Sequence, residues 1–367
     1  MIIKKKIFIL LILLNPIIFI AQESSSLDSV LFEYVHDQKI QELEKLLESG
    51  IDINIKNHLN ETLLMVACKG YDANIDIVRL LVNYGADVFY HDKIVERSAL
   101  SFSIKYLNHP IVELLLSSTS KNQKVVAFKD IGYLFVCLFV GDERTFESLL
   151  PFYSERLTET YLNYSLLEST ILLECRLKEL FSTSFITKGR QRLNPDAALI
   201  IFELLIENGV NVNEINADGI PTVFHSDCSS RLLKKFVTNG VDVNALDNSH
   251  GDSITILYSF IEEISSSNVN IGSEPVFLKE KNELEEDLEV LDLLIKNGAK
   301  LRNGYNNPFE YALVRAVQNK NINLLKILIH KGHNINFFDL EGKSLLIHAM
   351  ENNFSEIIDL LYKKGAH

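Results

Sequence analysis

The sequence predicts an all-α solenoid of about nine helix-turn-helix repeats, and two observations support this. The first is a glycine that closes a Leu-rich segment at a spacing near 33 residues, as at Gly298, Gly332 and Gly365. The second is that the Leu-rich segments carry apolar residues at i, i+3, i+4 and i+7, which is typical of one buried helix face. A fixed period of this size indicates stacked repeats. Because each repeat contacts only its neighbours, one elongated domain can hold residues 27–367.

The parts of one repeat are clearest in Leu324–Leu361. A helical segment ends at Gly332, where glycine can take the left-handed conformation that terminates a helix. An extended piece, Asn334-Ile335-Asn336, follows. A polar turn from Asp339 to Gly342 comes next, and a second helix then opens at Ser344.

These parts resemble the ankyrin repeat, and three segments carry the resemblance: Glu61–Ala67, Asp218–Val223 and Gly342–Ala349. The resemblance covers most of the chain from about Leu27 onward. It implies short β-turn fingers followed by antiparallel helix pairs. It also implies protein–protein binding through the fingers and the concave helix face, because stacked repeats form extended binding surfaces.

Three copies depart from the family pattern at the motif histidine, which is replaced by Met65, Phe224 and Ile347. We therefore expect the hydrogen bond that this histidine makes between repeats to be missing there, with apolar packing in its place. His225 and His348 share one position in their motifs. We expect them to pack within the repeat, with a place on the concave face as the alternative.

The remaining elements are placed by the same pattern. The period is interrupted at 151–195 and again at 265–282. Insertions at equivalent points of a repeat emerge on one edge, so we expect the basic loop Lys188–Arg192 and the Ser-rich loop Ser265–Pro275 to lie together, opposite the fingers. The expected helices are Asp28–His36, Ile40–Leu47, Ser98–Lys105, Pro110–Leu116, Ile131–Val140, Asp142–Leu150, Tyr164–Phe181, Asp196–Glu207, Arg231–Val237, Ile254–Ile264 and Glu283–Ile295.

The N-terminus has the composition of a secretory signal peptide. Three lysines, Lys4 to Lys6, precede an apolar run from Ile7 to Ile20, and Ala21 offers a cleavage site. We expect a signal peptide at 1–21, a linker at 22–26 and a protein exported to the periplasm or secreted. The alternative is an uncleaved membrane anchor through Ile7–Ile20. The Lys-, Asn- and Ile-rich bias and the Ala21-Gln22 junction indicate a bacterial precursor.

The net charge of −13 argues against nucleic-acid binding, because a phosphate backbone requires a basic face. It is compatible with a basic protein partner. We expect the partner to be another protein, with no small-molecule substrate, and a membrane only if the N-terminal segment stays uncleaved.

No catalytic signature is present: the sequence has no P-loop, nucleophile elbow or dinucleotide fingerprint. We expect no catalytic residue, no cofactor and no metal site; an enzyme centred on 151–195 is the weakest of the hypotheses. The four cysteines lie in different repeats, so we expect small buried thiols, with a disulfide as the alternative. They are Cys68, Cys137, Cys175 and Cys228.

The candidate partner-binding residues lie in the turn fingers, where exposed aromatic side chains can anchor an interface. They are His58, Tyr90, His91, Phe337, Phe338 and Asp339. The alternative is that one aromatic of each adjacent pair packs back onto the next repeat.

Overall fold

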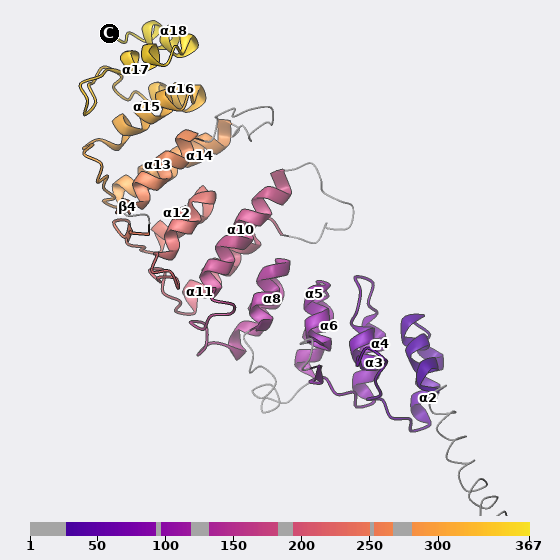
Figure 1. Cartoon of the computed structure of the whole chain (residues 1–367). Coiled ribbons are helices and arrows are strands. Elements are labelled where there is room, and N and C mark those ends of the chain that lie inside the picture. Colours follow the sequence, from indigo (N-terminus) through magenta and orange to yellow (C-terminus); the bar gives the residue numbers. More distant parts are fainter. Residues whose placement is uncertain (1–26, 93–96, 119–131, 183–193, 250–252, 267–280) are drawn as a thin grey trace, which may run out of the picture. The chain divides into compact units, whose positions relative to one another are not determined.

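The computed structural model describes residues 27–92, 97–118, 132–182, 194–249, 253–266 and 281–367. Helices in pairs, joined by short hairpins, make up nearly all of these residues (Figure 1). The chain divides into two compact units, and each is described by itself. Unit 1 comprises Met1–Arg156 and Arg192–Asn194, and unit 2 comprises Leu157–Gln191 and Pro195–His367.

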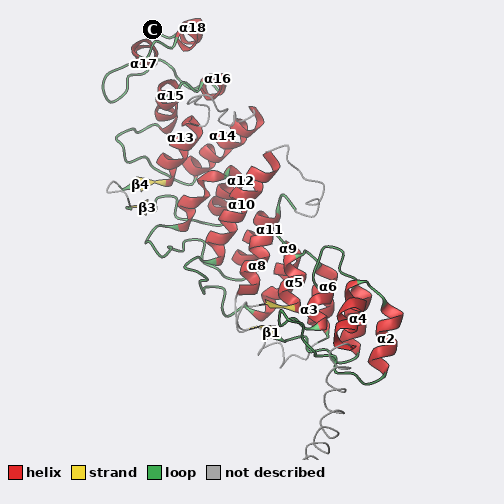
Figure 2. Ribbon diagram, turned by 45° about the vertical axis from the view of Figure 1, so that its right-hand side comes forward, coloured by secondary structure: helices red, strands yellow, loops and turns green. Residues whose placement is uncertain are grey.

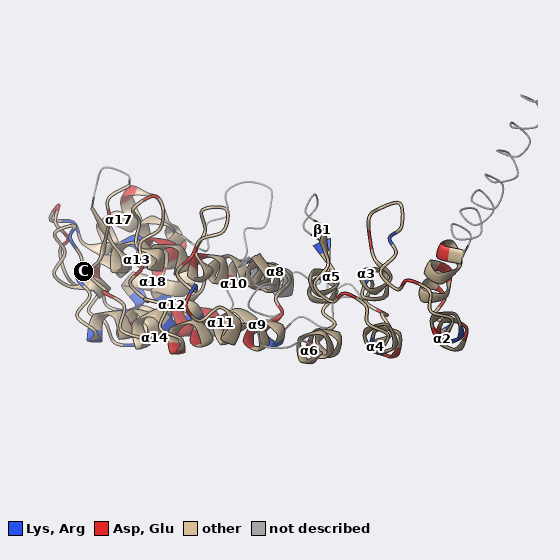
Figure 3. Ribbon diagram, turned by 90° about the horizontal axis from the view of Figure 1, so that it is seen from below, with Lys and Arg blue, Asp and Glu red and all other residues tan. Residues whose placement is uncertain are grey.

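Unit 1 has four helix pairs within the described residues. The first helices of successive repeats pack on one another, and so do the second helices. Figure 3 shows α3 and α5 between the projecting fingers and the second helices α4 and α6. The pairs are residues 27–36 with α2 (Ile40–Glu48), α3 (Leu63–Ala67) with α4 (Ile75–Asn83), α5 (Ala99–Lys105) with α6 (His109–Ser117), and α8 (Gly132–Val140) with α9 (Glu143–Leu149), which runs into the 3-10 helix η1 (Leu150–Phe152).

Unit 2 has five pairs, so that nine are described in all, as the sequence predicts. The first helices stack in the order α10, η2, α13, α15 and α17. Figure 2 shows the helices of these pairs in red and the described loops in green. The pairs are α10 (Leu166–Ser182) with α11 (Ala197–Glu207), the 3-10 helix η2 (Thr222–Cys228) with α12 (Ser230–Thr238), α13 (Ile256–Ser266) with α14 (Lys281–Lys296), α15 (Pro308–Gln318) with α16 (Ile322–His330), and α17 (Leu345–Glu351) with α18 (Ser355–Lys363).

Local chemistry explains where these helices begin and end. The hydroxyls of Thr62 and Ser344 accept hydrogen bonds from the backbone N–H of residues three further on, which caps α3 and α17. Second helices end at glycines such as Gly50 and Gly332, whose φ angles are +84° and +86°. Space is free for a Cβ at both positions. The left-handed backbone therefore selects glycine there.

Residues 151–195, where the sequence period is interrupted, contain a finger and a first helix. Tyr161 pairs with Tyr164 as a finger does, and α10 follows as a long first helix that packs on α11. This is the helix that the sequence predicts near Tyr164–Phe181. The signal segment (1–21), the linker (22–26) and the loops at 183–193 and 267–280 lie outside the described residues, so their placement remains a prediction.

The fingers are antiparallel hairpins at the start of the repeats. Two of them pair as short strands, and three more make a single β-bridge. The strands are β1 (His91–Asp92) with β2 (Arg97–Ser98) and β3 (Leu246–Asp247) with β4 (Ile254–Thr255); the bridges join Lys56 to Thr62, Tyr161 to Tyr164 and Ile215 to Pro221.

A ladder of asparagines ties successive repeats together next to the fingers. In each case the side-chain oxygen accepts a hydrogen bond from a backbone N–H that follows the next second helix. These bonds run from Asn54 to Asp87 (2.8 Å), from Asn213 to Asp242 (2.6 Å), from Asn244 to Lys300 (3.1 Å) and from Asn336 to His367 (3.2 Å). The sequence predicts only an extended segment at these positions, whereas the structure shows their function between repeats.

The cysteines differ in their bonding state. Cys68 and Cys137 are free and fully buried, as predicted. Cys175 is disulfide-bonded, so for this residue the prediction of a buried thiol is wrong. The argument from separate repeats fails because helices of successive repeats pack against one another, so cysteines of different repeats can lie close enough to bond. The side chain of Cys228 lies outside the described residues.

Candidate protein-binding groove

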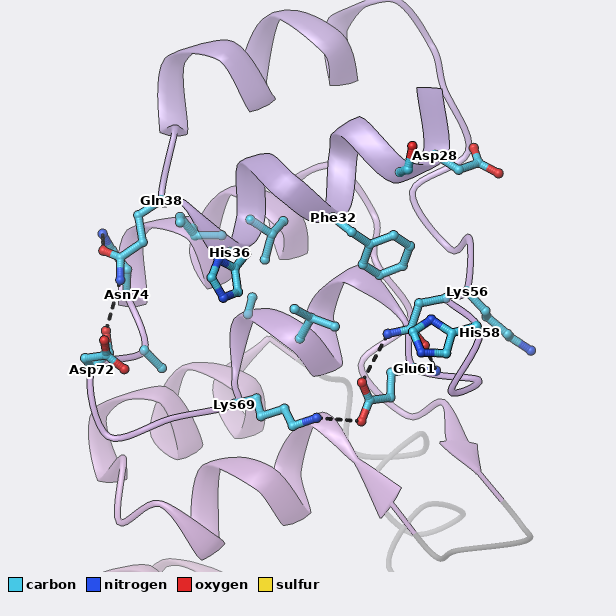
Figure 4. A pocket seen from close by; sticks show the side chains of 17 residues that line it. Asp28, Phe32, His36, Gln38, Lys56, His58, Glu61, Lys69, Asp72 and Asn74 are labelled. Atoms are coloured by element: carbon cyan, nitrogen blue, oxygen red, sulfur yellow. Dashed lines mark hydrogen bonds and ion pairs between the residues drawn. The ribbon is translucent and has the colours of Figure 1, made fainter. Parts of the chain in front are cut away.

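A groove of about 820 Å³ opens in unit 1 between the first helix and the second repeat (Figure 4). The helix at residues 27–36 forms one side. The finger that carries Lys56, His58 and Glu61 closes one end, and the loop between α3 and α4 lies at the other. The three segments come from two successive repeats, so stacking of the repeats creates the groove.

The floor of the groove is apolar. Phe32 and Val35 come from the first helix, and Val66 and Ala67 come from α3. Val35 and Ala67 are buried, whereas Phe32 and Val66 are only half-buried. A ligand that covers these last two side chains would gain roughly 25 cal/mol for each Å² of apolar surface that it removes from water.

Glu61 anchors the finger end. Its carboxylate is 2% exposed and accepts hydrogen bonds from Lys69 Nζ (3.0 Å) and Arg97 Nη1 (3.1 Å). Asn57 donates a third bond, to Oε2, at 3.1 Å. Because Arg97 belongs to β2 of the next repeat and also reaches Asp92, this group joins two adjacent fingers.

The charge of Glu61 is stabilised in this position. Burial by itself would raise the pKa of the Glu61 carboxyl, but the bonds from Lys69 and Asn57 and the charges of Lys69 and Arg97 outweigh it. The pKa of Glu61 therefore lies below its ordinary value of 4.5. The finger end of the groove is a fixed, ionised network rather than a set of mobile surface charges.

The loop end is fixed by amide groups. Gln38 Nε2 donates to the carbonyl oxygen of Asp72, and Gln38 Oε1 accepts from Asn74 Nδ2, both at 3.3 Å. Gly70 has a φ of +123°, and a Cβ there would lie 2.9 Å from Asp72 Oδ1. The glycine thus leaves room for the Asp72 carboxylate at the rim of the groove.

Of the three candidate residues in unit 1, His58 lines this groove, whereas Tyr90 and His91 do not. His58 is exposed. Tyr90 is half-buried, and Lys56 Nζ sits 4.1 Å from the centre of its ring. His91 is exposed on β1, where it pairs with Ser98. The structure therefore connects Tyr90 to the groove through Lys56.

The other candidates lie in the last finger, in unit 2. Phe337 is half-buried, and Phe338 is 73% exposed. This is the division expected if one aromatic packs back while the other stays available. The same position is exposed in another finger, since Ile215 stands at the equivalent point of its own finger and is 65% exposed.

Asp339 is occupied by contacts inside its own finger. Its Oδ1 accepts the backbone N–H of Glu341 and Lys343, and its Oδ2 lies 2.6 Å from Nε2 of His348. Burial opposes ionisation, but these bonds lower the pKa of the Asp339 carboxyl. Both carboxylate oxygens have partners, so Asp339 shapes the finger that carries Phe338. Asn57 and Asn216 close their fingers with the same pair of backbone bonds.

The two histidines that share a motif position both reach back to the finger. Nε2 of His225 lies 3.1 Å from Asn216 Nδ2, and His348 contacts Asp339. His348 is buried and His225 is exposed. Packing within the repeat is therefore observed for His348.

Sequence reasoning missed the network around Glu61, although a signal for it was present. Glu61 and Lys69 are eight residues apart and bonded, and so are Lys343 and Glu351 at the same point of the last repeat, with the charges exchanged. Aligning the repeats on Thr62 and Ser344 would have revealed this pairing.

Among the described residues, no group of three or more His, Cys, Asp or Glu is arranged to hold a metal ion. Burial raises the pKa of the Cys68 thiol to about 12, and the pKa of Cys137 is also raised by burial. Neither thiol is therefore a ready nucleophile. Across the described ranges, no helix has the length and apolar character needed to cross a membrane.

Comparison with known proteins points to one family. A family model described as ankyrin repeats in three copies matches residues 31–125 and 282–367. The mitochondrial disaggregase of Bos taurus is 28% identical over 182 residues, which cover 47% of this chain and 25% of the relative. The chain thus spans about a quarter of the length of this curated relative.

Solved structures show weaker similarity. The ankyrin repeat domain of Bcl-3 has a TM-score of 0.46 at 19% identity, over 72% of this chain and 97% of that one. An ankyrin repeat domain from Acinetobacter baumannii has a TM-score of 0.45 at 20% identity, over 58% and 98%. A structure of a predatory endopeptidase from Bdellovibrio bacteriovorus in complex with an immunity protein has a TM-score of 0.41 at 18% identity, over 57% and 96%.

Similarity at these TM-scores does not by itself identify the family. The family model matches a stretch in each unit, and paired helices, fingers and helix-ending glycines occur in both units. On that evidence the chain belongs to the ankyrin repeat family.

Proposed function

We propose that this chain is a non-enzymatic protein-binding module that holds an extended segment of its partner in the groove of unit 1. Ankyrin repeats generally mediate protein–protein interactions, and the fold is typically a non-catalytic scaffold. The observation that carries the proposal is an open groove with an apolar floor between two polar ends.

The rigidity of these ends supports the proposal. The finger end is held by the three bonds to Glu61, and the loop end by the two bonds of Gln38. Binding to groups that are already ordered loses less conformational entropy than binding to mobile ones. The groove is therefore prepared for a ligand before the ligand arrives.

Unit 2 offers a second contact surface. The four large apolar side chains of unit 2 with the highest exposed fractions lie in its fingers: Leu162 (77%), Phe338 (73%), Ile215 (65%) and Leu340 (62%). Phe338 and Leu340 lie two residues apart in one finger, and neighbouring exposed apolar side chains can mark an interaction site. We assign Phe338 to partner contact on this basis.

We further propose that the protein acts in an exported compartment, the periplasm or the extracellular space. The basic and apolar composition of residues 4–20 supports this, and so does the disulfide at Cys175, because disulfides persist in oxidising compartments. The alternative is an envelope protein anchored through Ile7–Ile20. N-terminal sequencing of the protein from cells separates the two: a start near Gln22 excludes the anchor, and a start at Met1 in the membrane fraction excludes cleavage.

The binding proposal is tested by affinity capture from an envelope extract, with two variants of equal charge. Ala73→Arg places a long side chain at the loop end of the groove, where Ala73 is half-buried. Gln41→Arg adds the same side chain at an exposed position of α2, outside the groove. A partner retained by the wild type and by Gln41→Arg but lost by Ala73→Arg supports the groove. A partner retained equally by all three proteins refutes it.

A further inference from the structure

We infer that the segment held in the groove is basic, with an apolar side chain between two Lys or Arg residues. The inference rests on the proposed function, because it concerns the ligand of the same groove. It comes from the charges that the groove has left unpaired.

The lysines of the groove are already engaged. Lys69 Nζ is bonded to the buried Glu61 carboxylate at 3.0 Å. Lys56 Nζ lies over the ring of Tyr90, 4.1 Å from its centre. A ligand carboxylate that approached either lysine would have to compete with these contacts.

Two carboxylates of the groove are available. Asp28 and Asp72 both line it, and neither has an ion-pair partner among the described residues. Figure 4 places them at opposite ends, with Asp28 above the finger that carries His58 and Asp72 beside Asn74. Asp72 is exposed and Asp28 is half-buried, so a ligand can reach both side chains.

Phe32, one of the apolar floor residues, lies between these two acids in Figure 4. Phe32 and Val66, the half-buried floor residues, can pack against one apolar side chain of a ligand. A bound segment with positive charges on both sides of that residue would place them near Asp28 and Asp72. An acidic segment would instead face two unpaired carboxylates, and such like-charge contacts oppose binding.

The charge of the whole chain favours the same ligand. The net charge of −13 raises the local concentration of cationic segments and lowers that of anionic ones. This long-range effect does not depend on position, so a test must separate it from the contribution of the two aspartates.

The test measures fluorescence anisotropy of three labelled nine-residue peptides with the full-length protein. The peptides share a central Leu and differ only in the residues flanking it, which are Lys, Gln or Glu. Two partly exposed ion pairs correspond to about a fivefold to tenfold gain in affinity. We expect the Lys peptide to bind that much more tightly than the Gln peptide in 50 mM salt, and the difference to shrink in 500 mM salt.

Matched variants assign the effect to the groove. The double variant Asp28→Asn, Asp72→Asn should lower the affinity for the Lys peptide to that for the Gln peptide. The double variant Glu42→Gln, Glu147→Gln removes the same net charge at exposed positions of α2 and α9 and should keep the Lys preference. Circular dichroism checks that each variant is folded.

Each other outcome overturns the inference in a recognisable way. The three peptides could bind equally, or the Glu peptide could bind best. If Ala73→Arg abolishes that binding, the groove remains a binding site but its ligand is not basic. A Lys preference that persists in the Asp28, Asp72 variant would reduce the effect to overall charge. If none of the three peptides binds, the inference is rejected. The proposed function is still tested independently, by affinity capture with the Ala73→Arg and Gln41→Arg variants.

Discussion

Removing the charge of Glu61 is the sharpest test of how adjacent repeats are held together. In the variant Glu61→Gln the side chain keeps its size but loses the charge that Lys69 and Arg97 share. Truncating one partner of a buried ion pair costs about 3–5 kcal/mol. Here the side chains of Lys69 and Arg97 are 39% and 29% exposed, so water can solvate part of the freed charge. We therefore expect the free energy of unfolding to fall by about 2 kcal/mol.

The pH dependence has a definite sign. The pKa of Glu61 is below 4.5 in the folded protein, so the unfolded state binds the proton more tightly. The stabilisation by Glu61 is then fully present above its unfolded value of about 4.5 and is lost as the pH falls through the lower folded pKa. The difference between wild type and Glu61→Gln should therefore be largest near neutral pH and shrink below pH 4.5.

The assay is urea unfolding followed by circular dichroism, because the chain has no Trp to report fluorescence. It is run between pH 3 and pH 7. Glu147→Gln is the control, since Glu147 is exposed on α9, and surface changes usually stay within about 0.5 kcal/mol. If Glu61→Gln costs no more than this control at pH 7, desolvation of the carboxylate cancels its bonds, and the network does not stabilise the protein.

Three further predictions address the fingers, the asparagine ladder and the cysteines. Phe338→Ala should change the midpoint of thermal unfolding little, because the ring is 73% exposed. Leu345→Ala, at a site that is 1% exposed, should lower the free energy of unfolding by about 2–5 kcal/mol. A large loss of stability for Phe338→Ala would show that its ring packs rather than binds. Asn213→Ala should lower the free energy of unfolding in urea by about 0.5–1.5 kcal/mol, because the N–H of Asp242 loses its acceptor. An unchanged stability would mean that water replaces the bond. In the native protein at pH 8, Cys68 should stay unalkylated, since burial raises its pKa to about 12. After unfolding without reductant, mass spectrometry should find fewer than four alkylated cysteines, because Cys175 is oxidised. Four alkylated thiols would contradict the disulfide.

The helical framework could be read from the sequence because each repeat specifies it locally. Helix starts at Thr62 and Ser344 and helix ends at glycines such as Gly332 follow from capping and backbone conformation, which depend on a few adjacent residues. Expected segments such as Asp196–Glu207 differ from the observed α11, Ala197–Glu207, by a single residue. The exposed aromatic of the last finger was also found, because turn chemistry places it at a hairpin.

The contacts between repeats were decided only by the tertiary structure. The bond from Arg97 to Glu61 joins residues 36 positions apart, and the disulfide at Cys175 requires a cysteine from another repeat. The role of Asp339 inside its finger likewise required His348 to be placed beside it. The groove arose in the same way, because Phe32, Val66 and Asp72 come from different segments and form one surface only when two repeats stack. Local sequence determines each helix and turn, whereas side chains brought together by stacking determine which charges are paired and which remain free for a partner.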